Sequence, residues 1–377
     1  MKMVKKNKTK NKGQSKRQVK RWSIHEKVFL VLIVTILVLG SLNVAKAKGW
    51  LIPEQPELDI IDGVIKLDTM TLEQKIAQMV VVHGGTHNLL SWKNMQIGGI
   101  HLFALESPEL YKDIISQFQQ GMQVPFFVTV DYEGCLNPFA NFINGTPVSE
   151  IDNIGDAFAK GSKDGKLLNE LGFSINFAPV VDLNDEIWGC RSFPGSPEEI
   201  ADLAEAYILG LQSKDMIATA KHYPGQTLVV KDPHKYIVVA TIGEEDIYPY
   251  QYLTKKDDVA SLMVSHIITT GEINSGGIPS VVSKELIFDL KEDYSGLIIS
   301  DEINMLGLKD FYPTIDQMYI AVFKAGNDVV LNFNEDPNEV YHMIQVIVGA
   351  VDKGIILEEQ IDNSVRKILT AKGFNVE

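Results

Sequence analysis

Cysteine is nearly absent from this chain, which has only Cys135 and Cys190 among its 377 residues. A zinc or iron–sulfur site built on cysteine needs several thiolates at short, regular spacing. Two cysteines so far apart in the sequence cannot supply such a set, so cysteine-based metal sites are excluded.

Positive charge is scarce beyond the first 27 residues. Residues 1–27 hold eleven Lys and Arg and a single acidic residue, Glu26, which gives this segment a charge of +10. The whole chain carries −14, so residues 28–377 carry −24. A strongly acidic body repels nucleic acid, and we therefore expect no nucleic-acid partner.

The basic head is followed by a continuous apolar run, VFLVLIVTILVLGSL, at residues 28–42. A basic segment before such a run is typical of an export signal or a membrane anchor. Two outcomes stay open. The long basic head favours a signal anchor, while the small residues Ala45 and Ala47 offer a cleavage site that would release a secreted protein. Either outcome places residues 48–377 on the far side of a membrane.

These patterns divide the chain into four parts. We expect a basic cytoplasmic head at 1–27, a membrane-spanning or signal segment at 28–47, a proline-containing spacer at 48–67 and a folded domain at 68–377. Thr71 and Gln74 form a capping-box pattern that predicts a helix at the start of this domain.

Eight apolar segments alternate with helical patterns along the domain. Near-continuous apolar runs are typical of parallel strands buried on both faces. Eight such units predict an α/β fold, a closed (β/α)8 barrel. A doubly wound open sheet is the alternative, but the turn HGGTHN after the first strand lacks the glycine spacing of a dinucleotide fingerprint. The predicted strands are 79–84, 98–104, 125–131, 174–182, 217–224, 260–266, 296–302 and 327–333.

Polar residues stand at the predicted carboxyl ends of these strands, where barrel enzymes place their active sites. One polar strand end is commonly a satisfied hydrogen-bonding group, but five such ends that face one mouth indicate a site. These residues are Asp131, Glu133, Asp182, Lys221, His222, His266, Asp301 and Glu302.

The residue types fit the hydrolysis of a glycosidic bond with retention of configuration. Asp301, after a buried strand, suits the nucleophile, although an Asp there could also cap a helix. Asp232 and His234 are spaced so that the carboxylate can orient an imidazole as general acid and base, although D-P-H is also a turn pattern. Lys221 and His222 suit sugar hydroxyls.

The domain resembles glycoside hydrolase family 3, specifically its single-barrel β-N-acetylglucosaminidases, over roughly residues 68–377. Six short motifs in the family's order carry this resemblance. They are D-x-E-G at 131–134, A-P-V-V-D at 178–182, C-R-S-F at 190–193, K-H-Y-P-G at 221–225, D-P-H at 232–234 and S-D-E at 300–302 with Met305.

The resemblance implies a role for each site residue. Asp301 would be the nucleophile, and His234 with its partner Asp232 would be the acid/base. The terminal sugar of a carbohydrate substrate would be held by Asp131, Arg191, Lys221 and His222. The chemistry would need no cofactor and no metal.

Two stretches depart from the family pattern. Leu136 and Phe139 stand where the family usually has arginines, one of which contacts the sugar, and residues 226–229 lack the usual His, Gly and Asp.

Two alternative functions stay open. Because a His acid/base does not repel an anion, phosphate could replace water and give a phosphorylase. The eroded motifs would also suit a sugar-binding protein without activity.

Cys135 and Cys190 follow the third and fourth predicted strands, whose loops are neighbours on a barrel rim. A disulfide between them would be permitted beyond the membrane. Since many exported bacterial proteins lack disulfides, we expect two free thiols in preference to the bond. A Cα separation above about 7 Å would exclude the bond.

Overall fold

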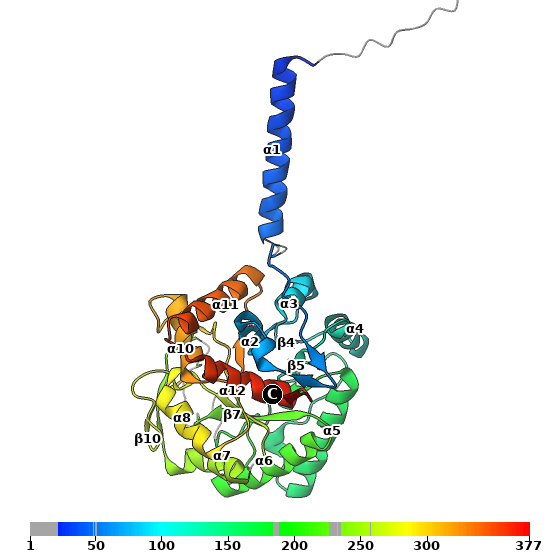
Figure 1. Cartoon of the computed structure of the whole chain (residues 1–377). Helices are drawn as coiled ribbons and strands as arrows, with labels where there is room; N and C mark the ends of the chain where they lie inside the picture. Colours follow the sequence, from blue (N-terminus) through cyan, green and yellow to red (C-terminus); the bar gives the residue numbers. More distant parts are fainter. Residues whose placement is uncertain are drawn as a thin grey trace, which may run out of the picture. The chain divides into compact units, whose positions relative to one another are not determined.

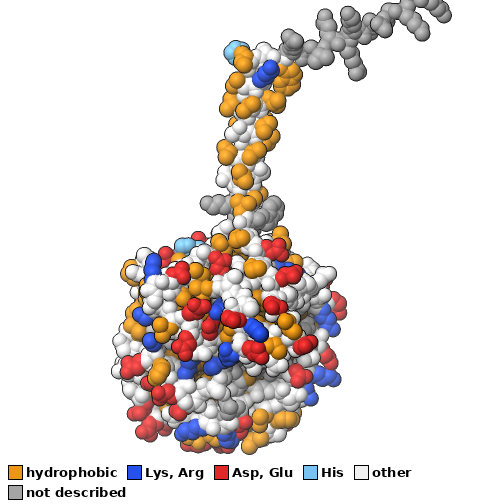
Figure 2. Space-filling view, in the orientation of Figure 1, with side chains coloured by type: hydrophobic (Ala, Val, Ile, Leu, Met, Phe, Trp, Pro, Cys, Tyr) orange, Lys and Arg blue, Asp and Glu red, His pale blue; other side chains and the backbone are white. Residues whose placement is uncertain are grey.

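The computed structural model describes residues 22–47, 49, 51–183, 188–225, 232, 235–256 and 258–377, in two compact units that divide after Ala47. The first unit contains helix α1 (Ile24–Ala47), which is exposed and predominantly apolar from Val28 to Val44 (Figures 1 and 2). By length and composition alone, α1 could cross a membrane over Ile24–Ala45.

Eight parallel strands form the centre of the second unit (Figure 1). They are hydrogen-bonded in the order β12, β3, β4, β5, β6, β7, β9 and β11, and a parallel bridge between Ile299 and Val329 joins the two ends. Each lies in one of the predicted segments, so the predicted (β/α)8 barrel is confirmed. The strands are β3 (Val80–His83), β4 (Gly99–His101), β5 (Phe127–Val130), β6 (Ile175–Asn176), β7 (Ile217–Tyr223), β9 (Ser261–Val264), β11 (Leu297–Ser300) and β12 (Val330–Asn332).

Helices follow the strands and cover the barrel. Their starts obey the capping signals in the sequence: Thr71 and Ser196 each form a capping box, with Gln74 and Glu199 respectively. The helices are α2 (Leu72–Gln78), α3 (Leu89–Met95), α4 (Pro108–Gln119), α5 (Ile154–Leu171), α6 (Pro197–Gln212), α7 (Glu244–Lys256), α8 (Lys284–Asp293), α9 (Leu306–Lys309), α10 (Ile315–Ala325), α11 (Pro337–Asp352) and α12 (Glu358–Ala371).

Strand β6 is shorter than the predicted segment 174–182. Pro179 has no backbone N–H and cannot continue a regular ladder. The chain instead makes isolated bridges at Val180, one to Ser192 and one to Lys221. Asp182 therefore lies on a loop beside β7, not at the end of a regular strand.

Two small sheets accompany the barrel. In the first, β2 (Val64–Ile65) pairs with β1 (Ile60–Ile61) and with β13 (Asn375–Val376) near the C-terminus. Much of the segment expected as a spacer is thus built into the domain, and Ile52, Leu58 and Ile65 are buried. In the second, β8 (Val239–Ile242) pairs with β10 (Ile268–Gly271), which anchors the chain that returns from the loop after β7.

A buried carboxylate ties the closing strands to two helices. Asp328, just before β12, is fully buried and accepts hydrogen bonds from the Ile298 N–H and the Ser364 hydroxyl. Its carboxylate also lies 2.8 Å from Lys291 Nζ and 3.5 Å from Lys367 Nζ. These contacts hold β11, β12, α8 and α12 together where the barrel closes.

The pH dependence of stability should report Lys372, which follows α12. Its ammonium donates to the Gly98 carbonyl (2.7 Å) and to Gln78 Oε1 (2.9 Å), and burial lowers the pKa of Lys372 to about 7. In the unfolded chain the lysine pKa is about 10.4, so between about pH 7 and 10 the unfolded state binds the extra proton. Stability contributed by this group must therefore rise with pH across that window.

We expect Lys372→Met to remove this rise. Urea unfolding of the detergent-solubilised wild-type and variant chains at pH 6, 8 and 9.5 would measure it. The difference in unfolding free energy between the two proteins isolates Lys372 from other titrating groups. A difference that stays constant over these three pH values would contradict the prediction.

Candidate functional site

A cavity of about 540 Å³ opens where the barrel strands end. Five of the seven site residues predicted from the sequence line it, and they come from four different strands or strand-end loops. These five are Asp131, Arg191, Lys221, His222 and Asp301. The carboxyl ends of the strands thus bring together residues that are up to 170 positions apart in the sequence.

Lys221, near the end of β7, is a buried cation of the cavity. Its Nζ lies 2.6 Å from Asp131 Oδ1 and also pairs with Glu133 Oε1. Lys221 and Glu133 are each about 3% exposed, whereas the Asp131 side chain is 40% exposed. Asp131 is therefore the member of this cluster that is open to a bound molecule.

The pairing keeps Lys221 and Asp131 ionised. Burial would lower the pKa of Lys221, but the charges of Asp131 and Glu133 outweigh burial and raise it. Burial would raise the pKa of Asp131, but the charge of Lys221 outweighs burial and lowers it. A cation and a carboxylate are thus fixed side by side, which suits a pair of neighbouring sugar hydroxyls.

Arg191, from the loop after β6, reaches the same cluster. Its Nη1 lies 3.5 Å from Glu133 Oε2, and its guanidinium stacks on the Trp188 ring with 4.0 Å between Cζ and the ring centroid. Glu133 therefore bridges the two cations of the cavity. The sequence placed Glu133 at a strand end without giving it a role.

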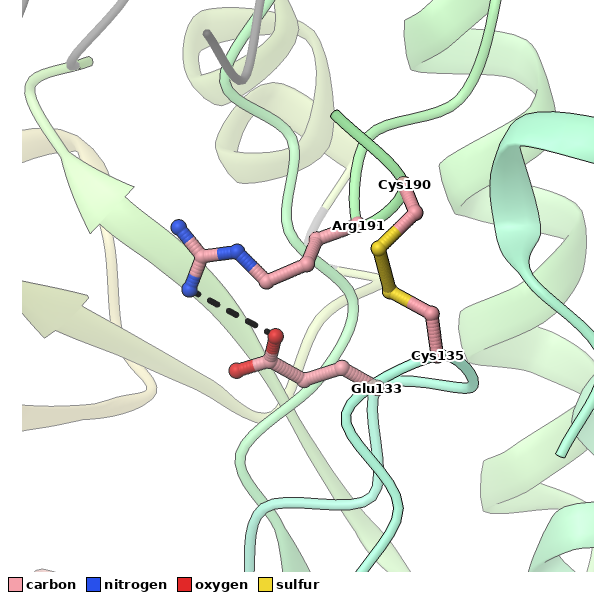
Figure 3. Close-up of a disulfide and its surroundings, with 4 residues drawn as sticks. All are labelled: Glu133, Cys135, Cys190 and Arg191. Carbon is pink, nitrogen blue, oxygen red and sulfur yellow. Dashed lines mark hydrogen bonds and ion pairs between the residues drawn. A yellow bond between two sulfur atoms is a disulfide. The ribbon is translucent and has the colours of Figure 1, made fainter. Parts of the chain in front are cut away.

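The two cysteines lie beside this bridge. Cys135 and Cys190 form a disulfide with a Cα separation of 6.1 Å, and Figure 3 shows it next to Glu133 and Arg191. The expectation of two free thiols is wrong. The loops after β5 and β6 approach closely enough for the bond because consecutive barrel strands place their loops side by side.

His222 is held by Asp182. Its Nδ1 lies 2.9 Å from Asp182 Oδ2, its backbone N–H donates to Asp182 Oδ1, and the Tyr250 hydroxyl donates to the same Oδ1. Because the carboxylate accepts at Nδ1, the proton of a neutral imidazole lies there. Nε2 is then left to accept a hydrogen bond.

Asp301 follows β11 directly, and its backbone N–H donates to the Val264 carbonyl of β9. The next residue, Glu302, also lines the cavity and accepts from the backbone N–H groups of Asn304 and Phe333. Burial raises the pKa of Glu302 above its ordinary value. Glu302 thus ties the end of β11 to the end of β12 beside Asp301.

The predicted acid/base pair is described only in part. Asp232 lies on the loop after β7, with Oδ2 3.2 Å from Lys235 Nζ. His234 and residues 226–231 lie outside the described residues. Among the residues that the structure does describe, no group of three or more His, Cys, Asp or Glu side chains is arranged to hold a metal ion.

The sequence profile of the glycosyl hydrolase family 3 N terminal domain matches residues 71–371. The chain belongs to glycosyl hydrolase family 3. Beta-hexosaminidase A of Pseudoalteromonas piscicida is 26% identical over 319 residues, which cover 73% of this chain and 53% of that protein. The chain thus spans about half the length of this curated relative.

A relative closer in length is beta-hexosaminidase LpqI of Mycobacterium tuberculosis. It is 26% identical over 328 residues, which cover 80% of this chain and 82% of LpqI. The solved structure of LpqI superposes with a TM-score of 0.74 at 24% identity and covers 82% of this chain and 95% of that one. The likeness of the structures establishes the fold.

The two positions where family 3 members usually have arginines differ in their surroundings. Leu136 lines the cavity, which makes that wall apolar. Phe139 is fully buried and packs edge-on against Tyr111 and Tyr132 in the core of the loop. The second substitution therefore contributes to packing and leaves the cavity wall to other residues.

An aromatic wall, which was not predicted from the sequence, completes the cavity. His101 is buried, stacks on Phe177 and Phe333 and contacts Phe103 edge-on, and burial lowers its pKa to about 4. It is therefore neutral near pH 7. Phe103 remains 48% exposed at the mouth. Since these residues stand at or near strand ends, the rule that found the polar residues could have found them.

Proposed function

We propose that this chain is a retaining glycoside hydrolase that removes terminal β-linked N-acetylglucosamine, or a related β-linked sugar, from cell-wall-type glycans such as peptidoglycan. The observation that carries the proposal is the position of Asp301. In a family 3 chain, this carboxylate lines the same cavity as a fixed set of sugar-compatible groups. The names of the relatives, beta-hexosaminidases, support the choice of sugar.

The proposed reaction has two displacements. Asp301 attacks the anomeric carbon, the bond to the leaving oxygen breaks, and His234 donates a proton to that oxygen. Water then attacks the glycosyl-Asp301 ester, His234 takes the proton of the water, and the carboxylate is released. Asp232 orients the imidazole, and Asp131, Arg191, Lys221 and His222 hold the terminal sugar.

The location of the enzyme forms part of the proposal. Residues 1–27 would remain in the cytoplasm, residues 28–47 would anchor the chain, and the barrel would lie on the extracytoplasmic face. The support is the +10 charge before an apolar segment that forms a helix long enough to span a bilayer.

Asp301→Ala tests the nucleophile. Turnover of an aryl β-N-acetylglucosaminide should fall by at least about 10³-fold, because no carboxylate remains to form the glycosyl-enzyme. Added azide should restore part of the turnover and yield the α-glycosyl azide, since one displacement inverts the configuration. Near-UV circular dichroism controls for folding. Retained turnover in the variant would eliminate the assignment.

The products of the wild-type chain separate hydrolysis from the alternatives. A hydrolase releases free sugar with or without phosphate, whereas sugar 1-phosphate formed only when phosphate is supplied would indicate a phosphorylase. Binding of N-acetylglucosamine without turnover of any aryl glycoside in a panel would indicate a sugar-binding protein.

His234→Ala tests the acid/base. Loss of a general acid typically lowers the rate about 10²–10⁴-fold. The rate of the glycosylation step should fall far less for a dinitrophenyl glycoside than for an unsubstituted phenyl glycoside. The good leaving group needs little protonation. Asp232→Ala should show the same pattern more weakly, because it removes only the orienting group. Equal losses on both substrates would rule His234 out as the acid.

Fractionation of cells tests the location. The chain should sediment with membranes, resist a carbonate wash, and expose its barrel to protease added from the extracytoplasmic side. Recovery of the protein from the medium with Lys48 as its first residue would contradict the anchor and support cleavage after Ala47.

A further inference from the structure

The Cys135–Cys190 disulfide joins two loops close to the residues that these loops contribute to the cavity. Cys135 lies two residues after Glu133 on the loop that follows β5, and Cys190 immediately precedes Arg191 on the loop that follows β6 (Figure 3). The bond therefore connects the backbone that carries a buried carboxylate to the backbone that carries its guanidinium partner.

The loop after β5 is a firm support for this link. Gly134 has a φ of +95°, and a Cβ there would lie 2.4 Å from the Thr146 carbonyl, so two parts of the loop are in close backbone contact. The Glu133 N–H donates to the Leu136 carbonyl, which closes the turn that contains Cys135. The carboxylate of Glu133 is also paired with Lys221 of β7.

The loop after β6 is fixed on both sides of Arg191. The parallel bridge between Val180 and Ser192 holds the backbone that follows Arg191, and the disulfide at Cys190 holds the backbone that precedes it. An arginine side chain has many rotamers, and ordering it on binding costs conformational entropy. A backbone that is already held in place lowers this cost, because fewer positions of the guanidinium remain. The contacts with Glu133 and Trp188 then define the direction of the side chain.

We propose that the Cys135–Cys190 disulfide is a positioning element that holds Arg191 in the cavity and thereby sets the affinity for the terminal sugar. This inference rests on the proposed function. The disulfide acts through Arg191 and has no part in bond breaking, because the nucleophile Asp301 is carried by β11 on another part of the barrel. Loss of the bond therefore affects KM more than kcat.

The disulfide can be opened in the folded protein. Both cysteines are only partly buried, so a small thiol can reach them. A thiolate of dithiothreitol attacks one sulfur and its second thiol resolves the mixed disulfide. The reagent becomes a cyclic disulfide, and the protein gains two electrons and two protons as Cys135 and Cys190 thiols.

The first measurement compares the oxidised and reduced full-length chain in detergent on an aryl β-N-acetylglucosaminide. Reduction should raise KM by about tenfold while kcat changes by less than about threefold, as expected when binding preorganisation is lost. Cys135→Ser with Cys190→Ser should behave like the reduced protein and should not respond to dithiothreitol. If that variant fails to fold, reduction of the folded wild-type chain still decides.

A second variant tests whether the effect passes through Arg191. In Arg191→Ala, KM should already be raised, and reduction should add less than about twofold, because coupled groups are non-additive. Independent tenfold effects of Arg191→Ala and of reduction would overturn the proposal and leave the disulfide with a purely structural role.

Trp188 supplies a readout that does not need turnover. Its ring stacks on the Arg191 guanidinium, so release of Arg191 should shift its fluorescence emission on reduction, and Trp188→Phe should abolish that shift. A shift without activity on any glycoside would uphold the positioning role while the proposed reaction fails. An emission and a KM that are both unchanged by reduction would overturn the inference.

Discussion

The charge of Lys221 is buried at the end of β7, and the arrangement of the cavity depends on how that charge is balanced. An ammonium without a partner in such a place costs several kcal/mol, so carboxylates must approach it. Asp131 and Glu133 do so from the loop after β5. Glu133 in turn attracts Arg191 from the loop after β6. One buried cation thus sets the positions of two neighbouring strand-end loops relative to β7.

The disulfide adds a covalent constraint at the same place, and its two effects are distinct. In the unfolded chain it closes a loop between positions 55 apart, for which the chain-entropy model gives roughly 4 kcal/mol of stability. That term concerns the whole domain. In the native state the bond restricts local motion of the backbone that leads into Arg191. This second effect is the one that would change the affinity for a bound sugar.

The barrel could be predicted because its signal is repeated. Eight apolar runs of strand length leave few other architectures, and helix-start signals such as Thr71 with Gln74 lie next to the elements they specify. The candidate site followed from the same pattern, because the carboxyl ends of parallel strands must converge. Asp131, Lys221 and Asp301 therefore meet without any signal in the sequence that links them.

The features that escaped prediction depend on contacts that leave no local pattern. The pairing of β2 with β13 joins residues more than 300 positions apart through strands of two residues each. The disulfide requires a specific Cα separation, and sequence spacing places Cys135 and Cys190 on neighbouring loops without fixing that distance.

The two sides of the cavity are built differently, and this difference bears on how each would contribute to binding and catalysis. On the β5, β6 and β7 side, charged groups are fixed by one another and by a disulfide, so their interactions with a sugar are in place before it binds. On the β11 and β12 side, Asp301 is followed by Glu302, which accepts hydrogen bonds from the backbone N–H groups of Asn304 and Phe333. In the proposed mechanism the covalent bond to the sugar forms and breaks on this second side, at Asp301.

Interactions that are equally strong in the bound substrate and the transition state lower KM, whereas those that strengthen in the transition state raise kcat. The cluster of Asp131, Glu133, Arg191 and Lys221 is suited to the first task because none of these groups changes its charge in the proposed reaction. The side that carries Asp301 is suited to the second because, in the proposed mechanism, its carboxylate is consumed and regenerated in each cycle. Leu136, which stands where family 3 members usually have an arginine, lines the binding side, so within the proposed mechanism it changes which glycans bind and leaves the chemistry at Asp301 intact.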